Sequence, residues 1–147
     1  MLEIQAVPLT SQAFASFGDV IPGPGEPVVA RESLLINEGR ARRYDDLSRI
    51  HTSGPGGEPA ISLFVAQPMP EPMTMQMMER HPLGSQAFIP LDGQSFLVVV
   101  AAGDAEDSTA PGRPIAFLAH GGQGVNLRAG TWHHPLLPLE RDSRFLV

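Results

Sequence analysis

The residues best suited to chemistry in this sequence are a glutamate and two histidines. Glu79 and His81 lie two positions apart, so on a strand their side chains point to the same face. Gln86 follows a turn after His81, and His133 follows a glycine turn at Gly130. In a small β-structure the two imidazoles, the carboxylate and the amide could converge. Such a group could act as base and acid, or bind a metal ion.

The other histidines and the methionines are less informative. His51 and His120 lie in loop contexts, and we expect them at the surface. His134 faces away from His133 if the segment is extended, which leaves it a packing role or a dimer contact. Five methionines crowd residues 69–78 at irregular spacing. Without neighbouring cysteines they predict core packing rather than a copper site.

Composition excludes several kinds of function. The chain has ten arginines but no lysine and no cysteine, which rules out Schiff-base chemistry, disulfides and thiolate sites. Sixteen acidic residues give a net charge of −6, so we expect no nucleic-acid partner. There is no apolar run long enough to span a bilayer and no signal pattern at the N-terminus. We therefore expect a cytoplasmic protein without a membrane partner.

The elements that must position these residues are predicted to be short strands. A chain of 147 residues fits one domain, 1–147, and its fifteen glycines and fifteen prolines disfavour long helices. Thr10 can cap a brief helix through residue 16, with Phe14 and Phe17 on one face. The predicted strands are residues 2–7, 19–21, one or two within 28–44, 60–66, 73–80, 87–90, 96–102, 114–119 and 143–147.

Two turn signals and one apolar run refine this prediction. Asn37-Glu38-Gly39 predicts a turn within 28–44, and Asp92-Gly93 predicts a hairpin because this pair accepts positive φ. The run at 97–100 is apolar on both faces, so it belongs deep in the fold. The expected fold class is all-β: an antiparallel β-barrel or sandwich with short helical decoration.

Two segments resemble the metal-binding motifs of the cupin superfamily. Residues 79–93 are similar to the first motif, with Glu79 at its first histidine and Gln86 at its glutamate. Residues 122–133 are similar to the second, with Arg128 at its proline. Cupins are double-stranded β-helix barrels that hold one divalent metal. By this resemblance the metal ligands would be Glu79, His81, Gln86 and His133.

A longer resemblance covers nearly the whole chain. Glu-Arg-His-Pro-Leu-Gly-Ser-Gln-Ala-Phe-Ile-Pro at residues 79–90 resembles the signature of the ureidoglycolate lyase family, formerly called ureidoglycolate hydrolase. Residues 51–59 are the least similar, and family members usually continue past the position of Val147. The other similar runs are residues 14–21, 43–47, 98–101, 123–126 and 132–136.

This resemblance implies a reaction, a metal and an assembly. The family cleaves (S)-ureidoglycolate to glyoxylate and urea in allantoin and purine catabolism, forms homodimers and has been associated with nickel. The elimination needs a base for the hydroxyl, an acid for the departing nitrogen and a cation for the carboxylate. The implied catalytic residues are Glu79, His81 and His133, and the implied substrate-binding residues are Arg43, Arg128 and Gln86. Apolar strands near both termini, at 2–7 and 145–147, also favour pairing across a two-fold axis.

Two alternatives remain open. The first is a metal-dependent cupin oxygenase or isomerase acting on another small carboxylic acid. Against it, a second histidine and the glutamate are missing from the first motif, while iron oxygenases favour two histidines and a carboxylate. The second alternative is a non-catalytic cupin that binds a sugar or an acid, such as the sensor half of a regulator. No helix-turn-helix or basic segment accompanies the expected barrel.

Overall fold

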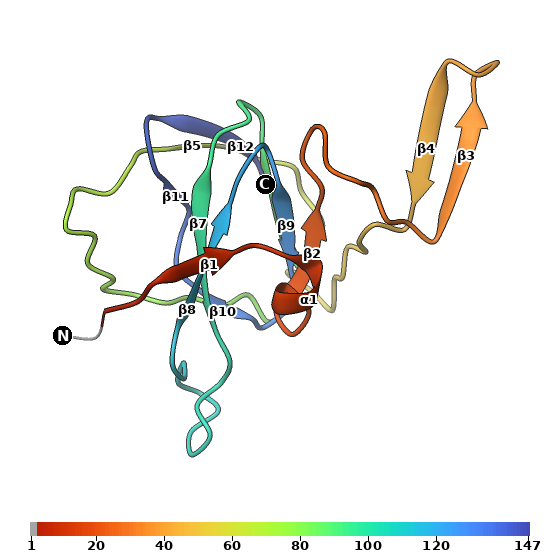
Figure 1. Ribbon diagram of the computed structural model, residues 1–147. Helices are drawn as coiled ribbons and strands as arrows, with labels where there is room; N and C mark the ends of the chain where they lie inside the picture. Colours follow the sequence, from red (N-terminus) through yellow and green to blue (C-terminus); the bar gives the residue numbers. More distant parts are fainter. Residues whose placement is uncertain (1–2) are drawn as a thin grey trace.

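The computed structural model describes residues 3–147, which form two five-stranded sheets and a separate two-stranded hairpin (Figure 1). Of the predicted strand 2–7, Leu2 lies outside the described residues. The elements in chain order are β1 (Ala6–Pro8), α1 (Ser11–Phe14), β2 (Gly18–Ile21), β3 (Glu32–Ile36), β4 (Ala41–Asp45), β5 (Leu63–Ala66), β6 (Gln86–Pro90), β7 (Phe96–Ala101), β8 (Ile115–Ala119), β9 (Gly124–Leu127), β10 (Trp132–His133), β11 (Leu137–Pro138) and β12 (Ser143–Leu146).

The two sheets confirm the all-β prediction. The first has the order β1-β8-β7-β10, with β11 also pairing with β7, and the second has the order β2-β9-β6-β12-β5. All pairs are antiparallel except β1 with β8, which is parallel. Within residues 3–147 the strands do not close into a continuous barrel, so the architecture is cupin-like in its two sheets without the expected closure.

The main core lies between the sheets and includes the short helix. Thr10 caps α1 by accepting a hydrogen bond from the Ala13 N–H, as predicted. Phe14 is fully buried, and its ring contacts that of Phe117 on β8 edge-on at a centroid distance of 5.3 Å. Phe17 packs beside both rings. No helix among the described residues is long and apolar enough to cross a membrane.

Strand β7 is buried on both faces, as its apolar sequence predicts. Val98 and Val100 face the core between the sheets, whereas Val99 faces the other side. On that side Met69 and Met75 pack against the sheet. This contact confirms the packing prediction for two of the five methionines, whereas Met73 and Met77 are exposed.

Two expectations about the strands are wrong, and one strand was missed. Asp92-Gly93 forms a turn with positive φ at Gly93, but it joins β6 to β7, which belong to different sheets and do not pair. Residues 73–80 form no ladder except an isolated bridge at Glu79. Strand β9 was not expected, yet it lies inside the second sheet between β2 and β6. Strand β9 has only four residues and begins at a glycine, so its sequence shows no alternation of apolar and polar side chains.

The buried aromatic cluster predicts a large mutational effect. Phe14→Ala should lower the free energy of unfolding by about 3–5 kcal/mol, because it leaves a cavity beneath α1. Phe64→Ala on edge strand β5, where the side chain is partly exposed, should cost less. Guanidinium unfolding of both variants measures the difference, and equal losses would contradict this view of the core.

Candidate active site

The candidate site is assembled by a backbone contact between two distant segments. Glu79 and His133 form an antiparallel bridge in which each N–H donates to the other's carbonyl oxygen at 2.8 Å. The Gly130 N–H also donates to the His81 carbonyl oxygen at 2.9 Å. The segment carrying Glu79 and His81 therefore continues the first sheet beyond β10.

The bridge brings three predicted residues together. The distance from Glu79 Oε1 to His133 Nε2 is 3.5 Å, and to His81 Nε2 it is 3.8 Å. The two imidazole centroids are 5.3 Å apart. Ligand atoms of all three side chains lie within 4.8 Å of one another, so the group could hold a metal ion.

His133 has the most restricted environment of the three. Its Nδ1–H donates to the Thr131 carbonyl oxygen at 2.9 Å, which leaves Nε2 with a lone pair directed at Glu79. Nε2 is buried and has no hydrogen-bond partner. Burial lowers the pKa of His133 below its usual value, although the Thr131 hydrogen bond and the Glu79 charge oppose this shift. Burial thus favours the neutral imidazole, in which Nε2 carries a free electron pair.

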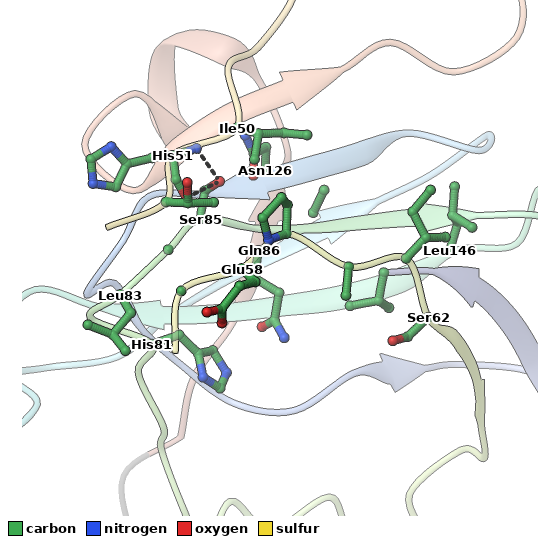
Figure 2. Close-up of a pocket in the computed structure, with 18 of the residues that line it drawn as sticks. Ile50, His51, Glu58, Ser62, His81, Leu83, Ser85, Gln86, Asn126 and Leu146 are labelled. Atoms are coloured by element: carbon green, nitrogen blue, oxygen red, sulfur yellow. Dashed lines mark hydrogen bonds between the residues drawn. The ribbon is translucent and has the colours of Figure 1, made fainter. Parts of the chain in front are cut away.

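Gln86 lies beside this group, at the start of β6. Its Oε1 is buried without a hydrogen-bond partner, and its side chain lines a cavity of about 640 Å³ together with His81. Figure 2 shows the side chains of His81, Gln86 and Glu58 pointing into the same space. Glu58 was missed by the sequence analysis because it belongs to no motif and lies in the segment least similar to the family.

The cavity is formed between the irregular segment 50–62 and the outer face of the second sheet. Ile50 and Ile61 contribute apolar walls, and Asn126 of β9 contributes a buried Oδ1 that has no hydrogen-bond partner. The Asn126 amide orientation is set because its Nδ2 donates to Ser48 Oγ and to the Arg49 carbonyl oxygen. Gln86 and Asn126 lie on opposite faces of the second sheet, because Gln86 pairs with the core residue Leu127, next to Asn126.

The predicted arginines are not brought to this cavity. Arg43 lies on β4 and pairs with Asp45 at 2.9 Å, and Arg128 is exposed just after β9. Neither lines the cavity. Arg80 stacks on Trp132, with its guanidinium carbon 4.7 Å from the ring centroid.

The other histidines lie outside the three-residue group. His120 is exposed, as expected. His51 is also exposed and its ring points away from the cavity, although its backbone pairs with Ser85 at the rim (Figure 2). His134 is buried and lies against the methionine-rich segment, which agrees with a packing role.

The geometry of the group suits a cation or a proton. A carboxylate oxygen and two imidazole nitrogens are all electron-pair donors, and an unpaired nitrogen facing a carboxylate is unfavourable without a positive centre between them. Two histidines and one carboxylate are also a donor set found at non-haem iron sites. The sequence alone suggested that two histidines and a carboxylate are not all present. In the structure they are, because Glu79, at the position of a cupin histidine, supplies the carboxylate.

Comparison with known proteins identifies the family of this chain. The family model described as ureidoglycolate lyase matches residues 1–147. A ureidoglycolate lyase of Brucella anthropi is 50% identical over 140 residues, which covers 95% of this chain and 78% of that protein. Those of Stutzerimonas stutzeri and Azotobacter vinelandii are 48% and 47% identical over 95% of this chain, covering 78% and 80% of their own lengths. With a match over its whole length, this chain belongs to the ureidoglycolate lyase family.

Proposed function

We propose that the group formed by Glu79, His81 and His133 cleaves ureidoglycolate to glyoxylate and urea. The observation that carries this proposal is the buried, unpaired Nε2 of His133 facing the Glu79 carboxylate at 3.5 Å. Membership of the ureidoglycolate lyase family supplies the reaction. The chain is accordingly a carbon–nitrogen lyase that acts on a small molecule.

The reaction requires two proton movements at one carbon. Ureidoglycolate carries a hydroxyl and a urea nitrogen on the same carbon, so loss of the hydroxyl proton and cleavage of the C–N bond produce an aldehyde and urea. Glu79 and His81 have partly exposed side chains, at 37% and 46%, and substrate can reach them. Glu79 accepts the hydroxyl proton, and His81 donates a proton to the departing nitrogen.

The unpaired acceptor of Gln86 suits the ureido end of the substrate. Gln86 Oε1 has no hydrogen-bond partner, and a ureido group offers N–H donors. Gln86 borders His81, so it would hold the ureido nitrogen near the reacting carbon. The substrate carboxylate needs a cation, for which Arg43 and Arg128 are the predicted side chains.

As an alternative to these proton transfers, the same three side chains fit a divalent metal such as nickel, because a lone pair that binds a metal no longer accepts or releases a proton. The unpaired Nε2 of His133 supports this fit, and imidazole is a common ligand of nickel, zinc and iron. Gln86 would be a fourth ligand by the cupin resemblance. A bound metal supplies positive charge to the oxygen that becomes the aldehyde. Thr131, through its carbonyl oxygen, orients the His133 ring for this role.

The donor set also keeps the oxygenase alternative testable. A two-histidine, one-carboxylate group loaded with iron could activate oxygen on another small acid. Oxygen uptake with small carboxylic acids, measured on the iron-loaded protein, distinguishes the two reactions. Family membership favours the lyase, for which no oxygen is consumed.

We also propose that the protein is a homodimer. Strand β1 is an edge of the first sheet, as expected, and β5 is an edge of the second. The expected edge at residues 145–147 is wrong, because β12 lies between β6 and β5. On β5 the apolar side chains of Leu63 and Val65 are 60% and 63% exposed. An uncovered apolar edge of this kind favours pairing with a second copy.

Substitution of the site histidines should abolish most of the turnover. His81→Ala and His133→Ala should each reduce kcat by about 10²-fold or more, the usual scale for acid–base groups. His120→Ala, at an exposed position outside the site, is the matched control and should cost little. Glyoxylate, urea and ammonia are quantified separately. Ammonia released in proportion to glyoxylate would identify an amidohydrolase instead.

Metal content provides an independent prediction. Purified protein should carry about one divalent ion per chain, and chelation should lower activity that nickel restores. Glu79→Gln and His133→Ala should each reduce metal content, whereas His120→Ala should not. Elemental analysis and an anomalous-scattering map measure this. Full activity of metal-free protein would remove the metal from the proposal.

Assembly can be measured directly. Sedimentation should give about 32 kDa, twice the 15.8 kDa of one chain. Val65→Asp on the β5 edge should shift the protein toward the monomer, because it places a charge in an apolar contact. A mass near that of one chain at micromolar concentration would refute the dimer.

A further inference from the structure

The hairpin formed by β3 and β4 stands apart from the rest of the protein. Figure 1 shows it extending away from both sheets at the end of an irregular connection. Its two strands pair only with each other, and most of their side chains are exposed. A lone two-stranded hairpin is at best marginally stable in water. Another surface is therefore needed to cover it.

Both faces of this hairpin carry exposed apolar side chains. The register places Leu35 opposite Arg42 on one face, and Leu34 opposite Arg43 on the other. Leu35 is 59% exposed, and Leu34 and Tyr44 are also exposed. An arm with partly exposed apolar groups on both faces is suited to lie against a partner.

The candidate site, in turn, lacks a cation and a cover. Glu79 and His81 are partly exposed, and the adjoining cavity contains the acidic Glu58 but no arginine. An elimination that develops charge on an oxygen proceeds best where water is excluded. A carboxylate substrate also needs a fixed positive group.

Charge makes the hairpin and the site complementary. Residues 31–45 hold four arginines and three acidic residues, whereas the remaining chain holds six arginines and thirteen acidic residues. Among the described residues Arg42 has no carboxylate partner, and its guanidinium reaches only Ser33 Oγ at 3.4 Å. Arg43 is held by Asp45 in a half-exposed pair, a kind that contributes little free energy. Both guanidinium groups are available to another anion.

We propose that the β3–β4 hairpin of one copy covers the site of a second copy, where Arg42, on the hairpin face that also carries Leu35 and Tyr44, binds the substrate carboxylate. This proposal rests on the proposed lyase function. It explains why no arginine lines the cavity of the same chain, since the cation that the site needs belongs to the partner. Each active site is then complete only in the dimer.

Subunit complementation tests this arrangement. Arg42→Gln/Arg43→Gln in one copy should raise the KM for ureidoglycolate by about tenfold or more, through loss of charge-assisted hydrogen bonds. The His133→Ala copy should be inactive because its own site lacks the imidazole, but its hairpin is intact. Co-expressed in equal amounts, the two variants should recover about a quarter of wild-type activity, because half the dimers contain one intact site.

Two controls make the recovery specific. Glu79→Gln co-expressed with His133→Ala should show no recovery, since both residues belong to the same site of one chain. Arg40→Gln at the hairpin tip, where the side chain pairs with Glu38, should keep wild-type activity. If the wild-type enzyme is active but the hairpin variant and His133→Ala show no recovery together, the proposal is overturned. The cation would then belong to the same chain, with Arg128 as the candidate.

Cross-linking tests the arrangement without any activity assay. The chain has no cysteine, so single cysteines can be introduced cleanly. Arg42→Cys in one tagged copy should cross-link, through a short thiol reagent, to Leu83→Cys in another, because Leu83 is exposed at the cavity beside His81. Glu106→Cys in the exposed loop is the control position. Equal yields for Leu83→Cys and Glu106→Cys would overturn the proposal, whereas an inactive wild-type protein that cross-links as expected would overturn only the lyase function.

Discussion

The two hydrogen bonds between the backbones of Glu79 and His133 are the contact on which the site depends. They attach an otherwise irregular segment to the edge of the first sheet and set the register of its side chains. The carboxylate and the imidazole are therefore held together by the backbone rather than by their own attraction. The bond from Gly130 to the His81 carbonyl adds a second point of attachment. Catalytic groups gain from such rigid support, because small displacements are costly.

The core beneath the site gives His133 its chemical character. The ring packs against Phe88 of the second sheet at a centroid distance of 6.0 Å, and its backbone pairs with Val100 of the first. The apolar surroundings keep the imidazole neutral, and the Thr131 carbonyl determines which nitrogen is free. The sandwich therefore both stabilises the fold and directs one lone pair toward a carboxylate.

Long irregular segments cover the outer faces of both sheets. The methionine-rich segment packs on the first sheet, and residues 50–62 form one wall of the cavity at the second. Residues 51–59 are also the part least similar to the family signature. Because Glu58 reaches the cavity from this segment, substrate preference can change through a loop while the bridge and the core remain unchanged.

Local patterns in the sequence determined most of the strands and turns of the fold, and part of the site. The two-residue spacing placed Glu79 and His81 on one face, the apolar run predicted that β7 is buried, and Asn37-Glu38-Gly39 predicted the β3–β4 turn, in which all three residues have positive φ. Such patterns depend on backbone geometry within a few residues, so they can be recognised without knowing the partner strand.

Only the tertiary structure decided which segments become neighbours. It showed that Asp92-Gly93 crosses between the sheets, that β9 lies inside the second sheet, and that Glu58 lines the same cavity as His81. The sequence distance between Glu79 and His133 carries no information about their bridge, because pairing of remote strands depends on the packing of the whole core. The sequence therefore determined the reactive groups and their faces, whereas their meeting in space was decided by long-range packing.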